Sequence, residues 1–264
     1  MSVNGHVERD PARRIDPRAD RVAVDGAVAS DQAERVVLAL HKPAGFVTTR
    51  VDPGGRSTVY DVLGDVGRWV FPVGRLDRDT SGLLVLTNDH RLGERLTSPE
   101  AHVEKAYHAR VRGIPDPEAL RALREGIPLD DGVPTRPARV SVLGTLRGST
   151  WLELVLTEGR NRQVRRMAAA VGLEVLELVR VRIGGLELRE LGLAVGEWRA
   201  LSAAELVRLS NSRTASPASS PGRPPRPAAA PSAPAPAPRM PRAAPVRDAP
   251  AARPCGSGPR RRDR

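Results

Sequence analysis

The chain has 264 residues, which allows one or two domains, and 40% of them are apolar, enough to build a core. A single cysteine, Cys255, excludes an intrachain disulfide and a cysteine metal site. No apolar run approaches the roughly 20 residues that span a bilayer, and the first residues hold no apolar signal region, so we expect a soluble cytoplasmic protein.

The positive charge is concentrated at the C-terminal end. The formal net charge is +11, and residues 210–264 hold 11 arginines against 2 aspartates, a net +9 that leaves +2 for residues 1–209. Such a basic tail favours a polyanionic partner. It also contains 14 of the 25 prolines and few large apolar residues, so we expect it to be disordered.

The first 28 residues carry turn and short-strand signals at Val3-Asn4-Gly5 and Val24-Asp25-Gly26. About 28 residues are too few to bury a stable core alone, so a flexible arm with a hairpin is one interpretation. Residues 29–35 form a polar linker. An apolar strand is expected at 36–40, and the chain turns at Lys42-Pro43.

Further elements lead to the most informative stretch of the chain. We expect a strand at 46–49 and a helical turn at 59–63. The sequence VGRLDRDTSGLLVLTND at 73–89 then places a charged loop directly before a buried strand, an arrangement typical of catalytic sites. The alternative is ordinary loop chemistry, with Asp77 paired to a neighbouring arginine and Asp79 capping a turn.

A capped helix is expected at 90–96 and a strand at 103–111. This strand carries Tyr107 on its apolar face, where an aromatic side chain is usually part of the core. A helix should begin after Asp116 and end at Gly126.

Strands are expected at 139–143 and 151–157, and the sequence EGRNRQVRRM at 158–167 then begins a helix. Four arginines at a helix start oppose the helix dipole, which suggests a nearby anion, either a phosphate or an active-site carboxylate. A solvated basic face is the alternative. A strand at 175–183, a closing hairpin and a short helix ending at Leu209 complete the ordered part.

Three of these stretches, GRLDRDTSGLLVLTND, EKAYHARV and EGRNRQVRRM, resemble motifs of the pseudouridine synthases that modify small- or large-subunit ribosomal RNA. The resemblance covers residues 36–209, with His90 and Gly185 as departures from glycine and proline. Residues 1–28 more weakly resemble a remnant of a small RNA-binding domain. The resemblance implies an α+β fold: a mixed, mainly antiparallel sheet flanked by helices, with a central active-site cleft.

The resemblance also implies conversion of a uridine in RNA to pseudouridine, with no metal and no organic cofactor. Asp77 matches the catalytic aspartate of the family, as nucleophile or as proton acceptor, and Tyr107 matches the tyrosine beside the reacting base. Arg165 matches the arginine that pairs with this aspartate. The carboxylate has to be ionised, so we expect a neighbouring cation to stabilise it.

Ribosomal RNA is the expected partner of a monomeric enzyme, with 23S rRNA of the large subunit favoured over 16S rRNA. A non-catalytic RNA-binding assembly factor is the alternative. A glycosidic hydrolase is disfavoured, because two carboxylates two residues apart in one loop are poorly placed for it. The expected RNA-binding residues are Lys42, Arg75, Arg160, Asn161, Arg162, Gln163 and Arg166.

Overall fold

The computed structural model describes residues 1–10, 12–16, 19–29 and 34–210. The tail expected to be disordered therefore lies, apart from Ser210, outside the described residues, as does most of the expected linker. No helix in the described part is long and apolar enough to cross a membrane.

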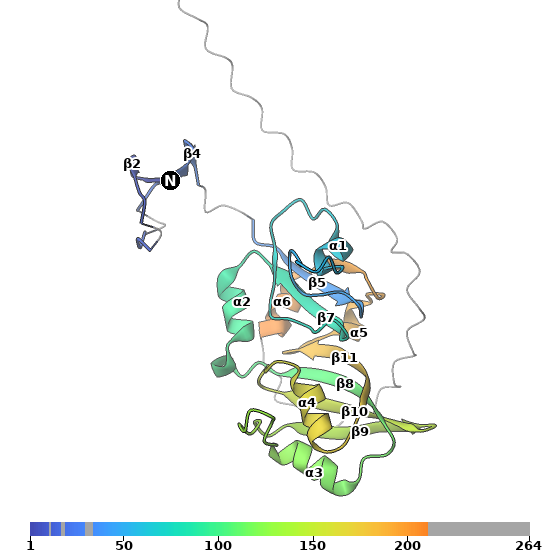
Figure 1. Ribbon diagram of the computed structural model, residues 1–264. Helices are drawn as coiled ribbons and strands as arrows, with labels where there is room; N and C mark the ends of the chain where they lie inside the picture. Colours follow the sequence, from blue (N-terminus) through green and yellow to red (C-terminus); the bar gives the residue numbers. More distant parts are fainter. Residues whose placement is uncertain (11, 17–18, 30–33, 211–264) are drawn as a thin grey trace, which may run out of the picture.

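A small antiparallel sheet forms at the N-terminal end, where Figure 1 labels β2 and β4. Its strand order is β2-β1-β3-β4. Its strands are β1 (Ser2–Val3), β2 (His6–Val7), β3 (Val22–Val24) and β4 (Ala27–Val28). Asn4-Gly5 forms the turn between β1 and β2, and Asp25-Gly26 forms the turn between β3 and β4. All four of these residues have positive φ. Asn-Gly and Asp-Gly are the dipeptides that such two-residue turns prefer, so the predicted turns are confirmed.

The main sheet has nine strands. Its main path runs β13 (Trp198–Ala200), β5 (Val37–Lys42), β7 (Ser81–Thr87), β11 (Val175–Ile183), β8 (Lys105–Arg112), β10 (Ser149–Leu156) and β9 (Arg139–Leu146). The short strands β6 (Phe71–Pro72) and β12 (Leu186–Glu187) pair with β7 and β11. Among the described strands only β7 and β11 pair in parallel, so the expected mixed, mainly antiparallel sheet is confirmed.

Helices cover the sheet, as Figure 1 shows. They are α1 (Val59–Leu63), α2 (His90–Thr97), α3 (Pro117–Glu125), α4 (Gln163–Ala170), α5 (Leu188–Leu191) and α6 (Ala203–Ser210). The side chains of Asp89 and Asp116 accept backbone hydrogen bonds at the starts of α2 and α3, which explains where these helices begin. Asp116 is followed by proline at the first helical position, another start signal.

Strand β7 is buried on both faces. Leu83 and Val85 pack in an apolar cluster with α2, α5 and α6, whereas Leu84 and Leu86 pack on the opposite side with α1. A third cluster places α3 and α4 against β8, β9, β10 and β11. The loop that precedes β7 is therefore attached to one of the most deeply buried strands of the protein.

Two sequence expectations differ from the structure. Residues 46–49 form no strand, and only an isolated bridge joins Val47 to Thr58. The expected closing hairpin is split: Ile183 pairs with Leu186 across a tight turn, but β13 instead pairs with β5 at the far edge of the sheet. Helix α5 separates the two strands and carries the chain across.

Candidate active site

The ammonium group of Lys42 organises the loop that contains Asp77. Its Nζ atom donates to the carbonyl oxygens of Thr80 (2.8 Å), Pro43 (3.0 Å), Asp77 (3.1 Å) and Arg78 (3.4 Å). Lys42 is fully buried, and this burial lowers its pKa to about 8 although Asp77 and Asp79 oppose the shift. Lys42 was predicted to bind RNA; in the structure its amine is buried and holds the loop through these four carbonyl oxygens.

Asp77 lies in a cleft of about 270 Å³ that Tyr107 and Arg162 also line. The Asp77 side chain is 27% exposed, and Nη1 of Arg162 lies 4.0 Å from its Oδ2 atom. Tyr107 comes from β8, and its Cα pairs with that of Arg180 on β11. Two of the three predicted catalytic residues, Asp77 and Tyr107, are thus brought to one cavity from separate elements.

Arg165 does not make the direct ion pair with Asp77 that the sequence suggested. Its guanidinium donates to the carbonyl oxygens of Asp79 (3.0 Å) and Val175 (3.2 Å), so it braces the loop through the backbone. Burial, followed by repulsion from Arg162, lowers the pKa of Arg165, while Asp79 and Asp77 act in the opposite direction. Among the described residues, the side chain that makes an ion pair with the Asp77 carboxylate is that of Arg162.

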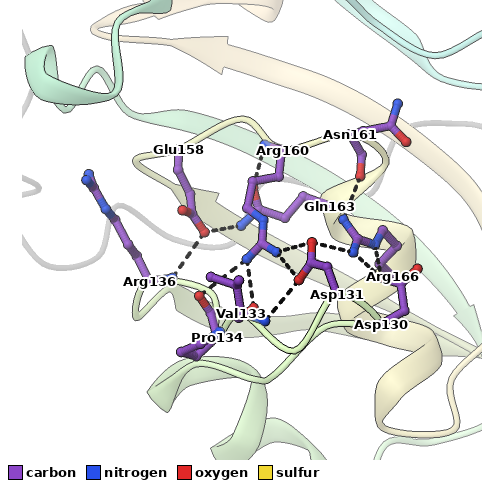
Figure 2. Close-up of polar contacts among 10 residues, drawn as sticks. All are labelled: Asp130, Asp131, Val133, Pro134, Arg136, Glu158, Arg160, Asn161, Gln163 and Arg166. Atoms are coloured by element: carbon purple, nitrogen blue, oxygen red, sulfur yellow. Dashed lines mark hydrogen bonds and ion pairs between the residues drawn. The ribbon is translucent and has the colours of Figure 1, made fainter.

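Two of the predicted RNA-binding arginines are held by aspartates of the same chain (Figure 2). Both Arg160 and Arg166 bind the Asp131 carboxylate, with Nη2 distances of 2.5 and 2.9 Å to Oδ2, and Arg166 also contacts Asp130. Nη1 of Arg160 further donates to the carbonyl oxygen of Val133 at 2.9 Å. For these two arginines the anion expected near the helix start is therefore an internal carboxylate.

The other predicted RNA-binding residues differ in how far their side chains are exposed to solvent. Gln163 is buried: its Oε1 accepts from the Arg160 amide at 3.0 Å and its Nε2 donates to Glu158 at 2.5 Å, so its amide is occupied. Gln163 therefore stabilises the loop, and its predicted contact with RNA stays a prediction. Arg75, Asn161 and Arg162 are exposed and line the cleft.

Two further basic residues in the cleft were not predicted. Arg180 is only 4% exposed, and Lys105 is half-buried on the same strand as Tyr107. The spacing of Lys105, two residues before Tyr107, would have placed both on one strand face. The signal for Arg180 was its position in the largely apolar strand VLELVRVRI at 175–183, where a charged side chain is unusual.

Comparisons with known proteins find related sequences over most of the chain. The family model described as RNA pseudouridylate synthase matches residues 36–170. Ribosomal large subunit pseudouridine synthase B of Bacillus subtilis (strain 168) is 39% identical over 211 residues, covering 79% of this chain and 84% of that protein. The protein of the same name from Escherichia coli (strain K12) is 42% identical over 211 residues, covering 78% of this chain and 72% of that protein.

Among solved structures, one described as the crystal structure of pseudouridylate synthase superposes with a TM-score of 0.62 and 32% identity. The match covers 79% of this chain and 87% of that one. The family match, at residues 36–170, includes all three sequence motifs.

Proposed function

The chain belongs to the RNA pseudouridylate synthase family, and we propose that it converts a uridine of large-subunit ribosomal RNA to pseudouridine. The enzyme is an isomerase, since the product contains the same atoms as the substrate. The choice of the large subunit is supported by the relatives from Bacillus subtilis and Escherichia coli, whose names specify that subunit.

Asp77 is the proposed catalytic carboxylate. The observation that carries this assignment is that Asp77 and Tyr107 line one cleft, with the Arg162 guanidinium 4.0 Å from the carboxylate. Carboxylates serve as nucleophiles in glycosyl chemistry, and here Asp77 attacks the anomeric carbon or removes a sugar proton. The base then turns and rejoins the ribose through carbon 5.

Tyr107 is proposed to stack on the uracil of a nucleotide that has left its helix. Flipping a base out of its stack costs a few kcal/mol, and contacts to the RNA backbone offset this cost. The exposed Arg75 and Arg162 are the cations proposed to contact phosphates. Asp79 is not a candidate nucleophile, because its side chain does not line the cleft and its carbonyl accepts from Arg165.

The test is tritium release from RNA labelled at carbon 5 of uracil, with large- and small-subunit ribosomal RNA as separate substrates. The wild type should release tritium from the large-subunit RNA. Asp77→Asn should abolish release while RNA affinity stays within about threefold, and Asp79→Asn should stay active. Equal activity of Asp77→Asn would overturn the assignment, and RNA binding without release by the wild type would indicate a non-catalytic binder.

A further inference from the structure

Two cations that line the cleft, Lys105 and Arg180, have no carboxylate partner among the described residues. Nε of Arg180 donates to the carbonyl oxygen of Leu83 at 2.8 Å, but its buried Nη2 atom has no hydrogen-bond partner in the part of the chain that the structure describes. Neither Arg180 nor Lys105 makes an ion pair with any described residue. Burial, followed by repulsion from Arg180, lowers the pKa of Lys105 to about 8.

This arrangement costs stability unless a ligand compensates it. Removing a cation from water carries a penalty of several kcal/mol, and a second nearby cation adds to it. The carboxylates of Asp77 and Asp79 raise the pKa of a further cation, the buried Lys42, whereas Arg180 lowers it. A cleft lined by cations that lack a carboxylate partner among the described residues, one of them with a lowered pKa, is a candidate binding site for an electron-rich group.

The positions of Lys105 and Arg180 indicate which part of an RNA reaches them. Lys105 and Tyr107 project from the same face of β8, and Arg180 is the cross-strand partner of Tyr107 on β11. Arg180 is 4% exposed, whereas the Arg162 side chain is 45% exposed. Phosphates follow the exposed surface of a folded RNA, so a group inserted beside Tyr107 is better placed to reach the buried Arg180 and the half-buried Lys105.

We propose that Lys105 and Arg180 bind the carbonyl oxygens of the flipped uracil and stabilise the negative charge that the base acquires during the reaction. The proposal rests on the proposed pseudouridine synthase function. When the bond between C1′ and N1 breaks, both electrons leave with the base, and conjugation spreads the charge over O2 and O4. The electron pair is then used to form the bond between C5 and C1′. The C5 proton is lost and N1 is protonated, so no atom is gained or lost overall.

The expected effect is on the chemical step. Donors aimed at developing charge in a water-poor site contribute about 10²- to 10³-fold to kcat when removed one at a time. Lys105→Met and Arg180→Met should each lower kcat for tritium release by about this factor. The KM and the dissociation constant for RNA should stay within about threefold, because the cations act mainly once the bond has broken.

The matched control is Arg110→Met, which removes a cation from the same strand. Arg110 lies outside the cleft, and its Nε is 3.4 Å from Oε2 of Glu177. This variant should keep the wild-type kcat. A wild-type kcat in both cleft variants, or a raised KM with unchanged kcat, would overturn the proposal, and the second result would identify a phosphate site instead.

A binding measurement separates this proposal from the assigned activity. 5-Nitrouracil is a uracil analogue that is ionised at neutral pH. It should raise the Tm of the wild type and of Arg110→Met but not of Lys105→Met or Arg180→Met, and inorganic phosphate should give no comparable shift. If the wild type is inactive on ribosomal RNA but shows this pattern, the proposed function is wrong, whereas the proposed uracil-binding site is supported. Equal shifts in all four proteins, no shift in any, or an equal shift with phosphate would overturn the site.

Discussion

Nη1 of Arg162 lies 4.0 Å from Oδ2 of Asp77, and this is the only ion pair that Asp77 makes within the described part of the chain. Arg162 precedes helix α4 in a left-handed conformation, with φ of 47°. Its side chain is 45% exposed. The guanidinium is therefore close to the carboxylate and still accessible to an RNA phosphate.

The Arg162→Ala variant should weaken RNA binding and reduce its salt dependence. Each phosphate contact releases about one counterion, so the slope of log K against log salt should fall in magnitude by about 1. The measurement is fluorescence anisotropy of a labelled ribosomal RNA fragment at several salt concentrations. Arg166→Ala is the control: Asp130 and Asp131 already bind its guanidinium, so its slope should match the wild type. An unchanged slope for Arg162→Ala would exclude Arg162 as a phosphate contact.

Lys42→Met should loosen the loop that carries Asp77. The substitution preserves the apolar stem but removes the donor to four carbonyl oxygens. Unsatisfied buried acceptors cost about 1–3 kcal/mol each, partly offset by loss of a buried charge, so we expect about 2 kcal/mol of destabilisation and at least about a tenfold lower kcat. Urea unfolding and amide exchange of residues 77–80 measure the effect. Wild-type exchange in this loop would contradict the role assigned to Lys42.

Gly82→Ala should disrupt the parallel pairing of β7 with β11. Gly82 has φ of +110°, and a Cβ atom there would lie 2.2 Å from the carbonyl oxygen of Arg180. Two backbones cannot move apart cheaply in a packed sheet, so we expect a loss of about 3 kcal/mol or more in unfolding free energy. Gly144→Ala on β9 is the control, because its Cβ would meet no atom within 4 Å. Equal unfolding midpoints of the two variants would refute this explanation.

The stability of helix α6 should depend on pH through Glu205. Hydrogen bonds from Arg199 at 2.6 and 2.9 Å, aided by Ser202, lower the Glu205 pKa from 4.5 to about 2. Because the folded-state pKa lies below the unfolded one, this stabilisation is present above pH 4.5 and is lost as the pH falls towards 2.

Glu205→Gln isolates this contribution in urea unfolding measured across that pH range. At neutral pH the variant should be about 1–2 kcal/mol less stable than the wild type. The difference should shrink as the pH approaches about 2, where the wild-type carboxyl group also becomes neutral. A difference that does not change with pH would show that Arg199 does not stabilise the ionised form.

The elements that carry the site could be predicted from the sequence because their signals are local. The apolar run after Ser81 predicted a buried strand, Asp89 and Asp116 predicted helix starts, and alternation placed Tyr107 on one face of β8. Each signal depends on residues within about one turn or a few strand positions, so no knowledge of distant contacts was needed. The long motif around Asp77 likewise indicated the family.

Only the tertiary structure decided the partners of the charged side chains. Asp131 lies about thirty residues before Arg160, yet the fold joins them and leaves Arg162 beside Asp77. The Lys42 amine, for which an RNA contact was expected, donates instead to the carbonyl oxygen of Asp77, thirty-five residues away in the chain. A guanidinium or ammonium group binds whichever oxygen the packing of remote loops brings within reach, and spacing along the chain does not encode that choice.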